Sequence, residues 1–589
     1  MRKTDISIVI VNYNVKDFLL QCLRSVEKSL SSAFCADLSV ETIVVDNDSN
    51  DSSVEYLRPL FPEVKFIDLK ENIGFGRANN IGFDHSNGRY VLILNPDTII
   101  EENTLKVMFD YMESNSEVGV AGCKVLNPDG SFQLACRRGF PSPRSAFSKL
   151  FGLQKLFPKS KIFAGYNQTF RSEDETYYID ALIGAFMFAR KETLDKVGGF
   201  DPDFFMYGED LDLCYRINKE DQKIAYVHTT SIIHYKGEST KRSSMNEVKR
   251  FYEAMEIFAG KHFSGSKLFL LLLRVGIMLR AFIAYAGNHR REIFTILFDL
   301  LAVNASMIIA TKIKSGLFFG FPDYAYPTLF IVLSSIVFMS MISVGEYFES
   351  KPTVTKSIFA LMISFFVLSS LTYFFKEFAS SRVIILMTIG FSSILTGAYR
   401  IILNISESIS EHANRKLTAI VGINENTLKI AKSLESAGSE LVGIISNGQS
   451  DYNNNGNYPL LGDIGELHKI IKNKGIREVI ITDPSVSNND LMRIVSESGG
   501  SSVRFHAAGN FDEVLAAGII YDITGVESTV PKYNISLPRY KLLKRSVDIA
   551  LSVILLTVGL PFLLLLKSDL KTSINKVWRV LNGTYSFIG

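Results

Sequence analysis

The pattern of hydrophobic and polar positions divides the 589-residue chain into three kinds of sequence. Up to about residue 262, short runs of Val, Ile and Leu alternate with amphipathic stretches. Between about 292 and 405, the apolar runs are about as long as a bilayer crossing. From 416 to about 535 the short alternating runs return. The pattern therefore predicts an α/β domain over residues 1–262, a transmembrane region over 292–405 and a smaller α/β domain over 416–535.

The first α/β domain begins with strands that are apolar almost throughout, as in ISIVIVNYN (6–14) and RYVLILNPDT (89–98). Such strands, separated by helical patterns, are typical of a parallel sheet that is covered on both faces. Ligands bind at the carboxyl ends of the strands in sheets of this kind. Polar residues gather at those ends, which predicts a ligand site there: Asn12, Asn14, Asp46, Asp48, Asn95 and Asp97.

Four apolar runs in the middle of the chain predict membrane-spanning helices, at 294–313, 327–344, 357–375 and 383–399. An earlier run, within 263–291, carries Arg274 and Arg280, which favours an amphipathic helix at the membrane interface over a further span. The basic cluster His289–Arg290–Arg291 before the first span predicts a cytoplasmic start. We therefore expect a multi-pass protein of the inner (plasma) membrane.

The smaller α/β domain contains the turn GINENT (422–427) between a strand and a helix. A dinucleotide-binding turn has three glycines, and only Gly422 is present, because Asn424 and Thr427 occupy the other two positions. This departure favours a structural or sensory domain over a cofactor-binding one. The last segment, 539–589, has about twenty apolar residues interrupted by Pro561, which indicates a membrane or re-entrant helix.

Charge and cysteine content restrict the expected partners and the cellular compartment. With 63 basic and 61 acidic residues the net charge is +2, so no nucleic-acid partner is expected. Five cysteines without a CxxC pair indicate reduced thiols in the cytosol. The first apolar run is six residues long, too short for a signal peptide, which supports a cytoplasmic location for the first domain.

The stretch FFMYGEDLDLCYRI (204–217) places Glu209, Asp210 and Asp212 among apolar residues. Burying carboxylates is costly unless they are paired or used. On the residues alone two interpretations stay open. The acids stand at the positive end of a helix dipole, or one of them is a catalytic base.

Six stretches in order, SIVIVNYN, VVDNDSND, ENIGFGRANNIG, LILNPDT, GEDLDLCYR and HYKGEST, resemble the family 2 glycosyltransferases, and within them the rhamnosyltransferase-like branch. The resemblance covers about residues 5–260. It implies a GT-A type, nucleotide-diphosphosugar-binding α/β domain. It also implies inverting transfer of a sugar from a nucleotide-diphosphate donor, dTDP-rhamnose by the branch, to an acceptor hydroxyl.

The same resemblance assigns roles to residues. Asp97 and His234 would hold a divalent cation, Mn²⁺ or Mg²⁺, although Asn95 replaces the first acid of the usual Asp-x-Asp pair. Asp210 would be the base, with Glu209 orienting the acceptor or tuning Asp210, and Asp212 without a direct role. The nucleotide sugar would contact a set of nine residues: Asn12, Asn14, Asp46, Asn72, Gly74, Arg77, Asn80, Asn95 and Asp97.

The C-terminal half resembles the membrane phosphoglycosyl transferases that act on polyprenyl phosphate. The segment that should carry their Asp-Glu dyad is missing between Lys567 and Lys576, so residues 539–589 are interpreted as a remnant, either degenerate or truncated. The resulting hypothesis is a membrane-anchored glycosyltransferase that extends a lipid-linked saccharide in bacterial surface polysaccharide synthesis. The alternatives are a bifunctional enzyme that also transfers sugar phosphate, and a non-catalytic scaffold or sensor that binds nucleotide sugars.

Overall fold

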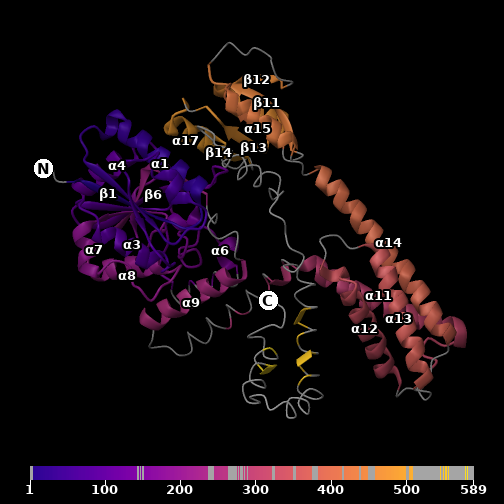
Figure 1. The fold of residues 1–589 in the computed structure, drawn as a ribbon. Helices are drawn as coiled ribbons and strands as arrows, with labels where there is room; N and C mark the ends of the chain where they lie inside the picture. Colours follow the sequence, from indigo (N-terminus) through magenta and orange to yellow (C-terminus); the bar gives the residue numbers. More distant parts are fainter. Residues whose placement is uncertain are drawn as a thin grey trace, which may run out of the picture. The chain divides into compact units, whose positions relative to one another are not determined.

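The chain forms two compact units in a computed structural model, one of residues Met1–Phe282 and Arg415–Ser528 and one of Ile283–Asn414 and Thr529–Gly589 (Figure 1). The structure describes residues 4–141, 152–235, 244–262, 289–321, 325–348, 353–374, 382–413, 417–436, 439–448, 458–483, 485–498 and 503–507, with isolated positions besides. Most of the predicted interfacial helix (263–291) and of segment 539–589 lies outside the described residues.

The first sheet is mixed, with the strand order β3-β2-β1-β4-β8-β6-β9-β5 and β7 paired to β9. Its strands are β1 (Ile6–Asn12), β2 (Val40–Asp46), β3 (Lys65–Asp68), β4 (Tyr90–Leu94), β5 (Thr98–Ile100), β6 (Val118–Leu126), β7 (Tyr177–Ile179), β8 (Phe186–Arg190) and β9 (Lys223–His234). The predicted parallel pairing holds for β1 to β4. It is wrong for β8, which runs antiparallel to both β4 and β6.

The reversed direction of β8 has a consequence for the site. Phe186 at the start of β8 pairs with Leu94 at the end of β4. Because β8 begins beside the carboxyl end of β4, the residues just before it lie where the strands of the parallel block end. A uniformly parallel sheet would place those residues at the opposite edge.

Helices pack around this sheet and bury its strands, whose Ile8, Val44 and Leu92 are fully buried. The helices are α1 (Lys16–Ser31), α2 (Ser53–Leu57), α3 (Phe75–Asp84), α4 (Thr104–Ser114), α6 (Leu153–Leu156), α7 (Lys191–Val197), α8 (Glu209–Lys219) and α9 (Ser244–His262). Cys22, Cys35, Cys123, Cys136 and Cys214 are all buried and free, as expected for reduced thiols.

The second α/β domain, defined here as residues 417–507, has an all-parallel sheet with the order β12-β11-β10-β13-β14. Its elements are β10 (Leu417–Val421), α15 (Glu425–Ser436), β11 (Glu440–Ser446), β12 (Leu460–Asp463), α16 (Leu467–Lys474), β13 (Glu478–Ile481), α17 (Asn488–Glu497) and β14 (Arg504–Ala507). Asn424 Nδ2 donates to the Thr482 carbonyl at 3.1 Å, and the Thr427 and Thr482 hydroxyls are 3.0 Å apart. Asn424 and Thr427, which occupy the two glycine positions of a dinucleotide-binding turn, thus bond to the residue that follows the neighbouring strand.

The second unit consists, in its described part, of the helices α11 (Arg290–Ser315), α12 (Tyr326–Ser343), α13 (Val354–Phe374) and α14 (Arg382–Ala413). Each predicted span lies largely or wholly within one of them. Three, α11, α13 and α14, are long and apolar enough to cross a membrane, whereas α12 contributes a shorter apolar helix, Pro327–Ser343.

Arg400 ties these helices together through buried charges. Its guanidinium donates to both carboxylate oxygens of Asp299 on α11, each at 2.8 Å, and to Glu346 Oε1 at 2.8 Å. Tyr347 donates to the same Asp299 at 3.1 Å. The side chains of Arg400, Asp299 and Glu346 are fully buried, so each charge depends on its partners for compensation.

We predict that Arg400→Met destabilises this unit by roughly 3–5 kcal/mol, because it leaves two buried carboxylates without their cation. Thermal unfolding of the full-length protein in detergent measures the loss. Arg382→Met, at an exposed position at the start of the same helix, is the matched control. Equal melting temperatures for the two variants would contradict the prediction.

Candidate active site

The two predicted metal ligands lie next to each other on adjacent elements. Asp97 follows β4, His234 ends β9, and Thr98 pairs with His234 across the β5–β9 ladder. His234 Nε2 is 3.3 Å from Asp97 Oδ1 and 3.5 Å from Asn95 Nδ2. Asp97 and His234 are both buried. Residues separated by well over a hundred positions in the chain thus form one polar cluster.

Gln133 orients the His234 ring. Its Oε1 lies 2.8 Å from His234 Nδ1, and its Nε2 donates to Asn127 Oδ1 at 2.9 Å. Because the amide nitrogen is used by Asn127, the oxygen faces the imidazole and favours a proton on Nδ1. The Nε2 lone pair then points to Asp97, which is the tautomer a metal ligand needs. Gln133 lies outside every quoted motif, so sequence reasoning missed it.

Several buried acceptors in this region have no hydrogen-bond partner among the described residues. They are Asn12 Oδ1, Asn95 Oδ1, Asp97 Oδ1 and Glu209 Oε2. Unpaired buried oxygens are costly, and that of Asp97 lies 3.3 Å from His234 Nε2. Oxygen and imidazole ligands suit Mn²⁺ or Mg²⁺, so these residues fit a divalent cation. The described residues contain no cluster of three His, Cys, Asp or Glu side chains suited to a metal, so Asn95 or a ligand must complete the coordination.

The ends of β1 and β2 hold the next group of predicted residues. Asn12 Nδ2 donates to Asp46 Oδ1 at 2.7 Å, and Asp46 Oδ2 accepts from the Ser49 amide at 2.9 Å. Asn14 Oδ1 accepts from the Asn50 amide at 2.6 Å. At the start of α2, Asp51 Oδ1 accepts a hydrogen bond from the Ser53 amide at 3.1 Å. Asp46 therefore shapes the turn beyond β2 and does not bond to the α2 backbone.

The glycine-rich turn contacts the loop that precedes α8. Asn72 Oδ1 accepts from the Gly74 amide at 3.0 Å. Gly74 has φ +90°, and a Cβ there would lie 2.4 Å from the Phe205 carbonyl oxygen. This glycine therefore permits a close approach to residue 205, in addition to any approach to a phosphate.

Arg77 and Asn80 support the same loop. Arg77 Nε donates to the Pro202 carbonyl at 2.9 Å, while its side chain stays exposed. Asn80 accepts from the Phe200 amide at 2.8 Å and donates to its carbonyl at 2.7 Å. Both polar atoms of the Asn80 amide therefore bond to the loop, which leaves few hydrogen-bonding positions for a ligand.

Asp210 is held by three donors at the start of α8. Its Oδ2 accepts from Arg138 Nη2 at 2.5 Å and from the Gly184 amide at 3.1 Å, and its Oδ1 accepts from the Leu211 amide at 2.8 Å. Hydrogen bonds to a carboxylate favour its ionised form. Arg138 was missed from sequence, because nothing near it in the chain indicates a partner 72 positions away.

Glu209 differs from its neighbour in environment. Burial, and then the charge of Asp210, raise the pKa of Glu209 to about 8. The raised pKa favours the protonated form of Glu209, whereas Asp210 makes an ion pair with Arg138. The adjacent acids are thus set up for different roles, which the helix-dipole interpretation alone does not explain.

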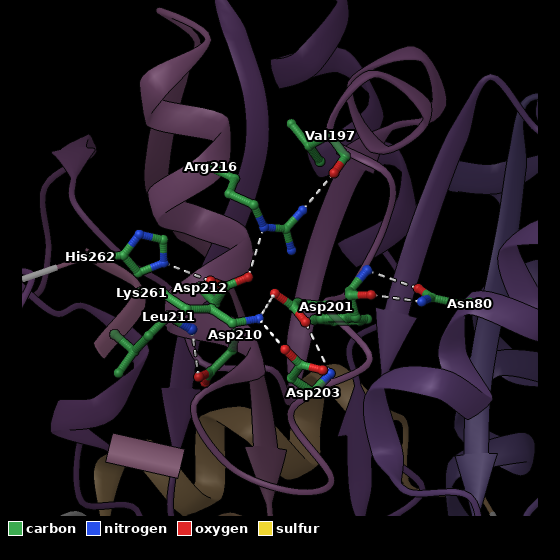
Figure 2. A network of polar contacts seen from close by, with 11 residues as sticks. Asn80, Val197, Asp201, Asp203, Asp210, Leu211, Asp212, Arg216, Lys261 and His262 are labelled. Carbon is green, nitrogen blue, oxygen red and sulfur yellow. Dashed lines mark hydrogen bonds and ion pairs between the residues drawn. The ribbon is translucent and has the colours of Figure 1, made fainter. Parts of the chain in front are cut away.

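Asp212 anchors α9 to α8 (Figure 2). Its side chain is fully buried and accepts from Arg216 Nε and from His262 Nε2, both at 2.7 Å. Lys261, the preceding residue of α9, pairs with Asp201 at 2.5 Å and Asp203 at 2.6 Å. The predicted lack of a direct role for Asp212 stays a prediction, and its structural role is to fix the helix that bears Asp210.

Residues 7–178 match the model of the glycosyl transferase family 2, and residues 348–507 match a CoA-binding domain model. An N-acetylglucosaminyl-diphospho-decaprenol L-rhamnosyltransferase of Mycobacterium tuberculosis is 26% identical over 285 residues, which cover 45% of this chain and 90% of the relative. A rhamnosyltransferase of Escherichia coli K12 is 31% identical over 171 residues, 28% of this chain and 61% of the relative. A poly-beta-1,6-N-acetyl-D-glucosamine synthase of Staphylococcus epidermidis is 26% identical over 215 residues, 36% of this chain and 47% of the relative.

Most of the first α/β domain thus matches the family 2 glycosyltransferase model, and its mixed sheet is GT-A-like. The protein is a glycosyltransferase of the hexosyl-transferring class, and its relatives act in rhamnosyl transfer and polysaccharide synthesis. These matches confirm the enzyme class predicted from the six motifs, and the family model matches residues 7–178 of the segment that carries those motifs.

We predict that Glu209→Gln weakens the pH dependence of stability. The raised pKa of Glu209 in the folded state means that its proton stabilises the fold below about pH 4.5 and that this contribution is lost as pH rises to about 8. Over that pH range, the free energy of unfolding of the wild type should fall by a few kcal/mol more than that of Glu209→Gln. Chemical denaturation at pH 5 and pH 8.5 measures the difference. Parallel losses in both proteins would contradict the assignment.

Proposed function

We propose that the protein is a membrane-anchored inverting glycosyltransferase. It moves a sugar from a nucleotide-diphosphate donor, with dTDP-rhamnose as the first candidate, to a lipid-linked glycan acceptor in bacterial surface polysaccharide synthesis. One observation carries the proposal. The Gly184 amide donates to Asp210, and the adjacent Ala185 carbonyl accepts from the Asn95 amide at 3.0 Å. The proposed base and the proposed metal-binding strand end are therefore joined through two consecutive backbone units.

In this mechanism Asp210 accepts the proton of the acceptor hydroxyl as that oxygen attacks the anomeric carbon. The ion pair with Arg138 holds the Asp210 carboxylate in place, and protonated Glu209 can donate a hydrogen bond to the acceptor. Asn12 and Asp46 bind the nucleoside, and Asp97, Asn95 and His234 would hold the cation. The cation, Mn²⁺ or Mg²⁺, supplies positive charge for the diphosphate leaving group.

The donor and the acceptor are inferred from two sources. The names of two relatives specify rhamnosyl transfer, and one of them specifies a decaprenol-linked acceptor. Within the described residues, three helices are long and apolar enough to span a membrane. Holding the enzyme in the membrane that contains a lipid-linked acceptor would raise the effective concentration of that acceptor. We also propose that the domains have the boundaries predicted from the sequence. The protein crosses the plasma membrane several times, with its glycosyltransferase domain on the cytoplasmic side.

The second candidate function is a non-catalytic sensor of nucleotide sugars. Asn95 in place of the first acid favours it, because an amide is a weaker cation ligand than a carboxylate. Binding without turnover is the outcome that separates the two functions.

We predict that Asp210→Asn lowers kcat by at least about 100-fold, because the amide cannot accept the proton, while donor affinity changes little. Nucleotide release from a panel of nucleotide sugars, with a lipid-linked acceptor extract, measures turnover. Asp221→Asn is the control, since Asp221 is exposed and its φ of +58° suits asparagine. Unchanged turnover in Asp210→Asn would refute the base assignment, and binding without any wild-type turnover would favour the sensor.

We predict that Gln133→Leu raises the Mn²⁺ concentration needed for half-maximal transfer by about 10–100-fold, because the His234 ring loses its orienting partner. His234→Asn should have at least as large an effect. His85→Asn, at an exposed histidine, serves as the control. Activity that persists unchanged with a chelator in all variants would contradict the cation site.

A further inference from the structure

The second α/β domain packs against the two strands that carry the candidate metal ligands. Ile99, two residues after Asp97, is buried in one hydrophobic cluster with side chains of that domain. Ile233 and Tyr235, which flank His234, belong to the same cluster. Its members from the second domain include Leu491, Met492 and Val495 of α17 and Phe505 of β14.

A carboxylate of the glycosyltransferase domain binds the start of α17. Glu102 accepts from the Asn488 amide at 2.5 Å and from the Asn489 amide at 2.7 Å, one with each carboxylate oxygen. In return, Asn489 Oδ1 accepts from the Glu102 amide at 3.2 Å. A carboxylate at this position is favoured both by the unpaired amides of the first turn and by the helix dipole. Glu102 follows β5 by two residues and Asp97 immediately precedes β5, so the bond is made just beyond the far end of the strand that Asp97 begins.

Further polar bonds surround that contact. The Asn488 side chain is buried and donates to the Ile100 carbonyl at 3.0 Å. Lys28 of α1 donates to the Val486 carbonyl at 3.0 Å, and Tyr235 donates to the Phe505 carbonyl at 3.2 Å. The Phe505 amide donates to the Pro128 carbonyl at 3.0 Å. The bonds reach β5, α1, the end of β9 and the loop after β6.

The geometry of β5 explains why this contact matters for the site. β5 has three residues, is the last strand in the sheet order, and pairs with β9 alone. So short an edge strand is weakly held by its own ladder, and its outer edge needs cover. Asn488 supplies a bond to that strand at Ile100, and the buried cluster covers Ile99. Asp97 immediately precedes β5, so the position of its carboxylate depends on the position of this strand.

We infer that the second α/β domain is a positioning part of the transferase. It holds β5 and β9 at the separation that lets Asp97 and His234 share one cation, and its contacts therefore set the affinity for that cation. This inference rests on the proposed function, because it concerns the same cation site. Glu102 and Asn488 are positioning residues, since they act through β5 and touch no reacting atom.

The test uses full-length protein in detergent, with Mn²⁺ alone as the probe. Asn488→Ala and Glu102→Ala should each raise the Mn²⁺ dissociation constant about tenfold, measured by electron paramagnetic resonance of free Mn²⁺. Glu102→Gln keeps one acceptor oxygen and should recover part of the affinity. Glu497→Gln, at an exposed acid of the same helix, should match the wild type. Nucleotide release at saturating Mn²⁺ should return to near the wild-type rate in all four variants.

The outcomes separate the two proposals. Mn²⁺ affinities unchanged in Asn488→Ala and Glu102→Gln, two variants expected to fold, would overturn the inference even if transfer is observed. A wild type that turns over no donor would refute the proposed function, while a tenfold weaker binding of Mn²⁺ in Asn488→Ala would still support the positioning role. Weaker binding that is not rescued at saturating Mn²⁺ would indicate general damage to the domain and would also count against the inference.

Discussion

The backbone at Gly184 and Ala185 is the constraint on which the candidate site depends. It binds Asp210 on one side and Asn95 on the other, so the start of α8 and the end of β4 are fixed relative to each other. This is possible because β8 runs antiparallel to β4 and begins at the edge where the parallel strands end. The direction of one strand therefore determines whether a proton acceptor and a cation site can serve a single reaction.

Charge is distributed unevenly around that backbone. Arg138 lies against Asp210, whereas Glu209 is buried with an oxygen that has no partner among the described residues. Burial and the neighbouring charge raise the pKa of Glu209, while Asp210 has a guanidinium partner that Glu209 lacks. Asp212, the third acid of the stretch, is used to bind α9 through His262 (Figure 2). Three carboxylates within four positions thus have three different physical tasks.

Carboxylates also link distant segments away from the site. Arg400 joins Asp299 and Glu346 among apolar helices, and Glu102 joins the second α/β domain to the glycosyltransferase domain through backbone amides. In both places a carboxylate has donors from a distant segment, and the contact links elements that are far apart in sequence. Such contacts specify which surfaces meet, because the alternative arrangements leave a charge buried without a partner.

The sequence by itself determined the division into α/β and membrane-like segments, the enzyme class and the gathering of polar residues at strand ends. These follow from local periodicity and from short motifs, which a chain carries whatever its tertiary contacts are. It predicted the location of Glu209 and Asp210 at a helix start, and it brought Asp97 and His234 together only through family resemblance. Tertiary structure alone decided the reversed β8, the partners Arg138 and Gln133, and the turn contacts of Gly74, Arg77 and Asn80. Those contacts join segments tens to more than a hundred positions apart, and a hydrogen bond between such segments has no periodic signature in the sequence.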